Sequence, residues 1–373
     1  MIMYDKMAYN RIVTTPPERL AYSLRVIKKS PFRAGALAWL LLLLLACTPG
    51  QAEASGGKEK APDAAAEEAV PPPLIGEETP AIIEPRFAVI PSSARPGEPV
   101  TVAYSGVSET QSSGHRAVLL NAEGKRLTQA AFFTLPRLEG EDEIRAAVFA
   151  VPSTAAPGDV IIRIESGEGI IRELPFVIES REFHSETIHL DKANTELRTT
   201  PSAERTAEAQ HLWAILHRTG TEIYSGDIFL PPLASTRRTS LFGSRRVFQY
   251  STGTSDTSIH AGVDYGVPTG TEVTSPARGR VVFAGTRIIT GNSVMLEHLP
   301  GVYSLYYHLD TIAVSEGAIV EAGELLGSSG ATGLATGPHL HWEIRVSTEN
   351  ADPDAFLSLA VLDKTAIINK LIE

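Results

Sequence analysis

Short apolar runs separated by glycine and proline turns occupy most of the chain after residue 82, and this pattern restricts the fold to one built mainly from β-strands. Turn signals such as Arg95-Pro96-Gly97 and Ala156-Pro157-Gly158 divide the runs in the first half. After residue 239 the runs are again short and are separated by glycine. The runs that support this prediction are Phe87–Ile90, Val100–Tyr104, Arg145–Phe149, Val160–Ile164, Gly279–Gly285, Ser293–Glu297 and Val302–His308.

A chain of 373 residues has room for two or three domains, because single hydrophobic cores stop growing well before that length. The strand spacing in residues 82–180 is typical of a β-sandwich of the immunoglobulin-like type. No cluster of ionisable residues occurs there, so a positioning or binding role is predicted. Residues 181–238 are interpreted as a connector with one helix, capped by Thr200 and ended by Gly220. Residues 239–357 are predicted to form a second β domain. Residues 358–373 are predicted to form an amphipathic tail that packs on the main body. Its apolar stripe consists of Ile367, Ile368, Leu371 and Ile372.

The first 46 residues have the pattern of an export signal. Basic residues from Arg25 to Arg33 precede the apolar run Ala34–Ala46. A membrane-spanning helix needs about 20 apolar residues, whereas the apolar core of a signal peptide needs only about 7 to 15. Residues 1–46 are therefore interpreted as a signal peptide, with an uncleaved signal anchor as the alternative.

Cys47 follows directly and is the only cysteine in the chain, so it can form no internal disulfide. The run Leu44-Leu45-Ala46-Cys47 resembles the lipobox of bacterial lipoproteins, which implies acylation of the Cys47 sulfur, cleavage before it and attachment to a membrane on the periplasmic side. Thr48 rather than Asp at the next position favours the outer membrane over the inner one. Residues 47–81, rich in Ala, Glu, Pro and Gly, are predicted to be a disordered tether.

The charge balance argues against nucleic acid as a partner. From Cys47 onward the chain has 26 basic and 42 acidic residues, a net charge of −16. Nucleic-acid binding needs clustered Lys and Arg that replace the counterions of the phosphates.

Alternation with a period of two in Pro338–Val346 predicts a strand with one apolar and one polar face. Two imidazoles from alternate residues then point the same way, as a divalent metal site with an adjacent base would require. The polar face carries His339, His341, Glu343 and Arg345, and the apolar face Leu340, Trp342, Ile344 and Val346.

A second segment, His260-Ala261-Gly262-Val263-Asp264, places an imidazole four residues before a carboxylate. Gly262, Gly266 and Pro268 make a helix unfavourable here, so an extended turn is predicted. Both side chains are acceptable zinc ligands, and three protein ligands plus water is the arrangement of a catalytic zinc site.

A third segment, the predicted strand Tyr306–Asp310, contains His308, which would share a face with Ser304 and Tyr306. On its own such a histidine is more typical of a packing residue than of a functional one. His298, near the end of another strand, is predicted to be structural because this position suits a turn hydrogen bond.

Taken together, HxxxD, a Tyr-x-His-Leu strand and a terminal HxH resemble, in this order, the motifs of the lysostaphin-like (LytM, M23) zinc metallopeptidases. The flanking segments Ser240–Arg245, Val273–Gly279 and Gly333–Pro338 also match. The resemblance implies an antiparallel β peptidase domain that binds one Zn²⁺ and cuts peptide stems or cross-bridges of bacterial peptidoglycan. Its metal ligands would be His260, Asp264 and His341, and its catalytic histidines His339 and His308, with the identity of the general base left open.

Other functions fit less well. A thiol nucleophile is excluded after Cys47, and no G-x-S-x-G elbow occurs. The glycine-punctuated segments Gly279–Val282 and Val314–Gly323 also resemble biotinyl and lipoyl carrier domains, but no lysine lies between Lys192 and Lys364 to be modified. The remaining alternative is a non-hydrolytic wall-binding lipoprotein that activates another wall hydrolase; whether a regulatory protein partner acts on this chain stays open.

Overall fold

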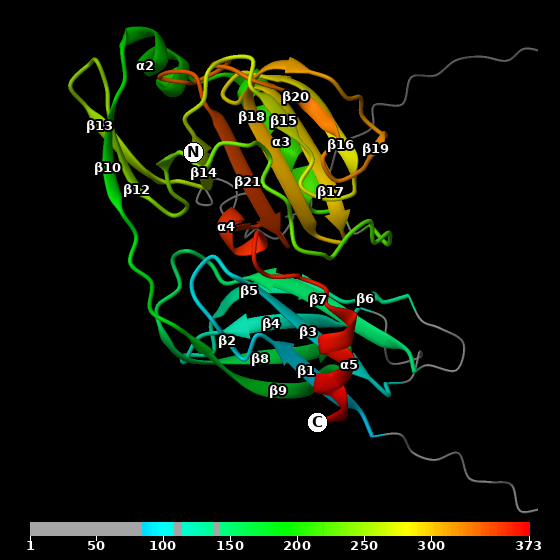
Figure 1. Ribbon diagram of the computed structural model, residues 1–373. Helices are drawn as coiled ribbons and strands as arrows, with labels where there is room; N and C mark the ends of the chain where they lie inside the picture. Colours follow the sequence, from blue (N-terminus) through cyan, green and yellow to red (C-terminus); the bar gives the residue numbers. More distant parts are fainter. Residues whose placement is uncertain (1–83, 108–113, 137–141, 219) are drawn as a thin grey trace, which may run out of the picture. The chain divides into compact units, whose positions relative to one another are not determined.

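The computed structural model describes residues 84–107, 114–136, 142–218 and 220–373, and these residues form mainly antiparallel β-sheets (Figure 1). The mainly β fold class predicted from the sequence is confirmed. The predicted signal peptide (1–46), Cys47 and the predicted tether (47–81) lie outside the described residues. Among the helices of the described part of the chain, none combines the length and the hydropathy of a membrane-crossing segment.

Two sheets share one hydrophobic core in the N-terminal part, which confirms the predicted β-sandwich. The strand orders are β1-β3-β7-β6 and β2-β9-β8-β4-β5. Val102 and Phe149 of the first sheet pack in the same buried cluster as Ile162 and Phe176 of the second. The strands are β1 (Arg86–Ile90), β2 (Ser93–Ala94), β3 (Pro99–Ser105), β4 (Arg116–Leu120), β5 (Arg126–Ala131), β6 (Phe133–Thr134), β7 (Ile144–Ala150), β8 (Gly158–Ser166) and β9 (Gly169–Ile178).

A ten-stranded sheet forms the C-terminal part, and its central path runs β11-β14-β21-β18-β17-β16-β19. Strands β14, β21 and β18 are neighbours although they lie far apart in the sequence, and their register places Asp264 opposite His341 and His341 opposite Tyr307. The strands are β11 (Arg238–Ser240), β14 (Gly262–Tyr265), β15 (Glu272–Thr274), β16 (Gly279–Arg287), β17 (Gly291–Leu299), β18 (Val302–Ile312), β19 (Ile319–Val320), β20 (Leu325–Ser329), β21 (Leu340–Val346) and β22 (Glu349–Ala351).

Strand β21 is buried on both faces. Its alternation is as predicted, because Leu340 and Trp342 join the main core, whereas His341 and Glu343 lie on the opposite face. Helix α3 (Ala203–Leu216) covers that opposite side of the sheet, where its Leu212, Ile215 and Leu216 pack with Met295, Tyr303, Leu305 and Tyr307. The polar face of β21 is therefore an interior surface, on which each charged side chain needs a partner.

The connector contains more structure than the single predicted helix. Strand β10 (Ser185–His189) pairs in parallel with β12 (Arg245–Gln249), which pairs with β13 (Ser255–Ile259). Helix α2 (Lys192–Thr199) begins at its N-cap Asp191. The prediction that Thr200 caps the helix is wrong, because Thr200 ends α2 in extended backbone and Ser202 caps α3 by accepting a hydrogen bond from the Arg205 amide.

The C-terminal tail forms helix α5 (Lys364–Ile372), after the short helix α4 (Pro353–Phe356). As predicted, the tail packs on the rest of the chain: α5 contacts β1 and β3, and its Ile367 and Leu371 are buried. Ile372 was expected in the same apolar stripe but is 68% exposed. The helix ends at this residue, so only the i, i+4 pair Ile367 and Leu371 faces the sandwich fully.

His298 is a packing residue of the core, in agreement with the prediction. Its Nδ1 donates to the Arg278 carbonyl at 3.0 Å, and its Nε2 then accepts from the Ser304 hydroxyl at 2.8 Å. The side chain has no exposed surface, and burial lowers its pKa to about 4. It is therefore held neutral in the folded protein at neutral pH.

This neutral state predicts a pH-dependent stability. In the unfolded chain the histidine pKa is about 6.5, so between about pH 6.5 and 4 the unfolded chain binds more protons than the folded chain. The free energy of unfolding therefore falls as the pH falls through this window. His298 contributes roughly 3 kcal/mol to this fall. We expect His298→Gln, which keeps a donor and an acceptor, to have a shallower pH dependence. Urea unfolding of the two zinc-free proteins at pH 7 and 4.5 measures it; equal dependence in both would contradict it.

Candidate metal centre

Three side chains from two segments converge at one buried point. His260 lies just before β14, Asp264 on β14 and His341 on β21, and all three are buried. His260 Nε2 lies 3.1 Å from both Asp264 Oδ1 and His341 Nδ1, and His341 Nδ1 lies 2.8 Å from Asp264 Oδ1. One atom from each residue lies within 4.8 Å of the other two. The HxxxD segment is extended, as predicted, and the β14–β21 register brings its carboxylate to the histidine of β21.

The opposite ring atoms of both imidazoles have hydrogen-bond acceptors as partners. His260 Nδ1 lies 2.9 Å from the Leu241 carbonyl, which can only accept, so the proton is on Nδ1 and Nε2 keeps its lone pair. His341 Nε2 faces the Glu343 carboxylate at 3.4 Å, and Arg345 pairs with that carboxylate in turn. Outer partners of this kind fix the tautomer and the ring orientation of metal-binding histidines.

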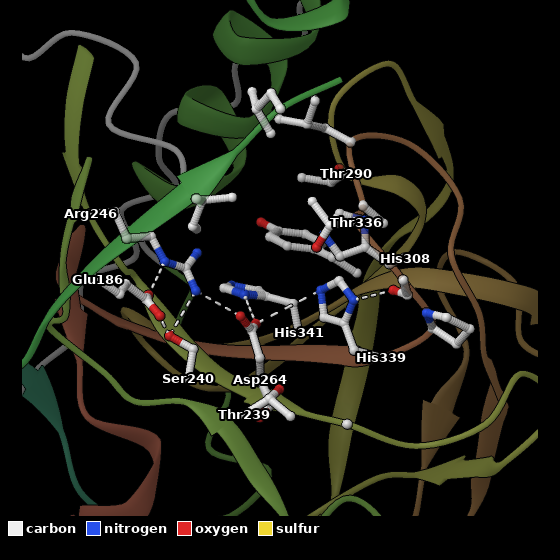
Figure 2. A pocket seen from close by; sticks show the side chains of 18 of the residues that line it. Glu186, Thr239, Ser240, Arg246, Asp264, Thr290, His308, Thr336, His339 and His341 are labelled. Carbon is white, nitrogen blue, oxygen red and sulfur yellow. Dashed lines mark hydrogen bonds and ion pairs between the residues drawn. The ribbon is translucent and has the colours of Figure 1, made fainter. Parts of the chain in front are cut away.

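His308 and His339 lie beside this cluster, with ring centroids 4.7 Å apart. His308 Nδ1 donates to the Thr332 carbonyl at 2.7 Å and His339 Nδ1 to the Gly337 carbonyl at 2.8 Å. Each ring therefore presents Nε2 as an acceptor, and His339 Nε2 lies 4.0 Å from Asp264 Oδ1. Figure 2 shows His308, His339, His341 and Asp264 pointing into the same space.

The predicted strand face of His308 was wrong. The backbone of His308 has a φ of +62°, in the left-handed region, and this interrupts the alternation of β18. Consecutive residues Tyr307 and His308 consequently both line the pocket, and the Tyr307 ring stacks on His341 with centroids 5.3 Å apart. Local periodicity contains no signal for such a turn within a strand.

Electrostatics keep the cluster in the protonation states that metal binding requires. Burial lowers the pKa of His260 to about 4 and, together with the neighbouring His339, that of His308 to about 3. Burial alone would raise the pKa of Asp264, but the imidazoles of His260 and His341 hold it well below its usual range. At neutral pH His260 and His308 are therefore neutral and Asp264 is ionised.

The cluster opens into a pocket of about 390 Å³. Besides the histidines, its walls come from the segment before HxH, from β10 of the connector and from β12, which pairs with β10. The connector wall was missed in the sequence, although the alternation of Glu186, Ile188 and Leu190 was its signal. The residues of this wall that line the pocket are Glu186, Ile188 and Leu190 from the connector and Arg246 and Phe248 from β12.

Arg246 is a second residue that sequence reasoning missed. Its Nη2 donates to Asp264 Oδ2 at 2.7 Å and to the Ser240 hydroxyl at 2.8 Å, and its Nε donates to Glu186 Oε1 at 2.5 Å. Figure 2 shows this chain of contacts on the far side of Asp264 from His339. The side chain of Arg246 is only 6% exposed, so its charge is neutralised by two carboxylates rather than by water.

The donor set fits zinc. Two imidazole nitrogens and one carboxylate oxygen are typical zinc ligands, and three protein donors at the wall of an open pocket leave a further coordination position, as catalytic zinc sites do. No fourth protein donor completes a closed structural site among the clustered groups of the described residues.

Comparison with known proteins places this site within a peptidase domain. Residues 258–353 match the sequence model described as "Peptidase family M23", a range that contains all five polar residues of the cluster. The chain is 40% identical over 128 residues to "DD-carboxypeptidase/endopeptidase Mpg" of Neisseria meningitidis serogroup B, which covers 34% of this chain and 29% of the relative. It is 34% identical over 119 residues to "Peptidoglycan DD-endopeptidase ShyB" of Vibrio cholerae, which covers 31% of this chain and 28% of the relative.

Among solved structures, a putative peptidase M23 from Pseudomonas aeruginosa aligns with 72% of this chain and 95% of its own length, at 24% identity and a TM-score of 0.48. The chain spans less than a third of the length of these two curated relatives.

Proposed function

Since this chain belongs to peptidase family M23 through residues 258–353, we propose that it is a zinc-dependent endopeptidase that hydrolyses peptide stems or cross-bridges of bacterial peptidoglycan. The observation that supports this most directly is the convergence of His260 Nε2, Asp264 Oδ1 and His341 Nδ1 beside two further imidazoles. The names of the relatives, a DD-carboxypeptidase/endopeptidase and a peptidoglycan DD-endopeptidase, support the substrate.

Zinc bound by these ligands would supply a Lewis acid for the scissile carbonyl and lower the pKa of water toward ~7. The chain itself supplies proton transfer. His339 and His308 each keep Nδ1 on a carbonyl, so each presents Nε2 to the pocket. His339 Nε2 can accept the proton of the attacking water, whereas the lowered pKa of His308 suits it less to that step. Once protonated, the same imidazolium can donate to the leaving amine, so one histidine can serve both halves of the reaction.

The experiment that tests this proposal is digestion of purified peptidoglycan by the form lacking residues 1–47. We expect zinc-loaded protein to release peptides and new amino groups, chelator-treated protein to release none, and added zinc to restore release. Metal analysis should give one zinc per chain. If the zinc-loaded protein releases nothing, the proposal is wrong and the non-hydrolytic activator becomes the better reading.

We also propose that the mature chain begins at an acylated Cys47 on the periplasmic side, with the outer membrane as its site. This rests on the basic and apolar pattern of residues 25–46 and on the absence of any other cysteine. A peptidase held by a lipid and a tether would meet the wall polymer directly. The mass of the N-terminal peptide of the purified protein checks it, because an unmodified Cys47 would contradict acylation.

A further inference from the structure

Arg246 connects the zinc ligand Asp264 to the connector, and it lies outside the matched residues 258–353. Figure 2 shows Glu186, Arg246 and Asp264 in a row that ends at the metal cluster. A cation this close to a metal ligand needs an explanation, because a positive charge disfavours a second cation nearby.

We propose that Arg246 and Glu186 are positioning residues for zinc: Arg246 holds the Asp264 carboxylate so that only Oδ1 faces the metal, and Glu186 balances the charge of Arg246. The proposal rests on the zinc site of the proposed function, and it assigns the connector strand β10 a part in that site.

The contacts of Asp264 divide its two oxygens between two tasks. Oδ1 lies within 3.1 Å of donor atoms of His260 and His341, whereas Oδ2 lies 2.7 Å from Arg246 Nη2. Because a planar guanidinium donates in fixed directions, it restrains the rotation of the carboxylate that it contacts. Oδ1 is therefore presented to the metal before the metal binds.

The contacts of Glu186 address the charge. Its Oε1 accepts from Arg246 Nε and from the Ser240 hydroxyl at 2.7 Å. With both carboxylates ionised, the unit of Glu186, Arg246 and Asp264 has a net charge of −1, which favours a divalent cation. Without Glu186 the same unit would be neutral, and the positive charge of Arg246 would offset the attraction between the Asp264 carboxylate and zinc.

Strand β12 itself offers a matched control. Arg245, the preceding residue, points away from the metal, donates to the carbonyls of Gly243 and Ser153, and lies over the Phe183 ring. Arg245→Met removes the same charge from the same strand without touching Asp264. It should leave zinc affinity unchanged.

The zinc dissociation constants of the full chain, purified in detergent, test the proposal by competition with a chromophoric chelator. We expect Arg246→Met to weaken zinc binding by about 10–100-fold, the usual effect of losing an outer partner of a metal ligand. Glu186→Gln should weaken it in the same direction, and Arg246→Lys, which keeps a charged donor but not the fork, should lie between wild type and Arg246→Met. At saturating zinc the variants should recover activity with an unchanged KM.

The sign of the Arg246→Met result is decisive. If Arg246 were only a repelling cation, its removal would tighten zinc binding, and that result, or no change, would overturn the proposal. A raised KM with unchanged zinc affinity would instead make Arg246 a substrate contact and would also overturn it. If wild-type protein itself fails to bind zinc, the proposed function fails first, so the two failures are distinguishable.

Discussion

His341→Ala is expected to lose both zinc and hydrolysis, whereas His339→Ala is expected to keep zinc and lose hydrolysis. His341 contributes Nδ1 to the metal cluster, so its removal should cost more than the ~10–100-fold in zinc affinity that loss of an outer partner costs. His339 contributes no atom to the cluster, and its Nε2 is a proton acceptor 4.0 Å from Asp264 Oδ1. Loss of a general acid–base group lowers the rate by about 10²–10⁴-fold.

Zinc content of the dialysed proteins and the rate of amino-group release from peptidoglycan measure the two effects separately. Circular dichroism of both variants serves as the control for folding. Zinc loss in His339→Ala would place that residue among the ligands, and a His339→Ala protein with full activity would remove it from the proton-transfer step.

Gly262→Ala is expected to disrupt the metal site by a steric clash with the backbone of β21. A methyl group on Gly262 would lie 2.1 Å from the Trp342 carbonyl oxygen and 2.9 Å from the Glu343 Cα. Both contacts are backbone atoms of β21 and cannot rotate away. The strands that hold Asp264 and His341 would have to separate, so we expect a loss of stability at or above the upper end of the ~1–3 kcal/mol that overpacking usually costs.

Zinc affinity should fall with stability in this variant, because the distance between the Asp264 and His341 donors depends on the same pair of strands. Urea unfolding and chelator competition measure both quantities. Gly167→Ala is the matched control, since a methyl group there meets nothing within 4 Å. A Gly262→Ala protein with wild-type stability would show that the two strands are not as closely apposed as described here.

The ligand side chains of the metal site could be predicted from the sequence, because the face of a strand on which a side chain lies depends on local alternation. Alternation in Leu340–Val346 determines which side chains share a face, and Gly262 and Pro268 exclude a helix around HxxxD. Once both segments are strands of one antiparallel sheet, pairing of β14 with β21 is sufficient to bring Asp264 and His341 together. The structural role of His298 could be predicted from its position near the end of a strand, but its partner, the Arg278 carbonyl just before β16, could not.

Other features depend on contacts that no local pattern encodes. The pocket wall needs residues 185–189 to pair with residues 245–249, across two helices that the sequence suggested only in part. The contact of Arg246 with Asp264 follows from that pairing. The left-handed backbone of His308 is imposed by its surroundings, because its amide donates to the Thr290 carbonyl and its ring to the Thr332 carbonyl.

Two walls of the pocket differ in stability, because β10 lies at the edge of its sheet and β21 lies inside its own. Strand β10 has one hydrogen-bonded neighbour and alternates between exposed and half-buried residues, whereas β21 is paired on both sides and buried throughout. Segments with few buried contacts open at a lower free energy than the core, and amide hydrogen exchange measures that difference. Local unfolding of β10 would therefore widen the pocket from one side while the β14–β21 pairing keeps Asp264 and His341 in register.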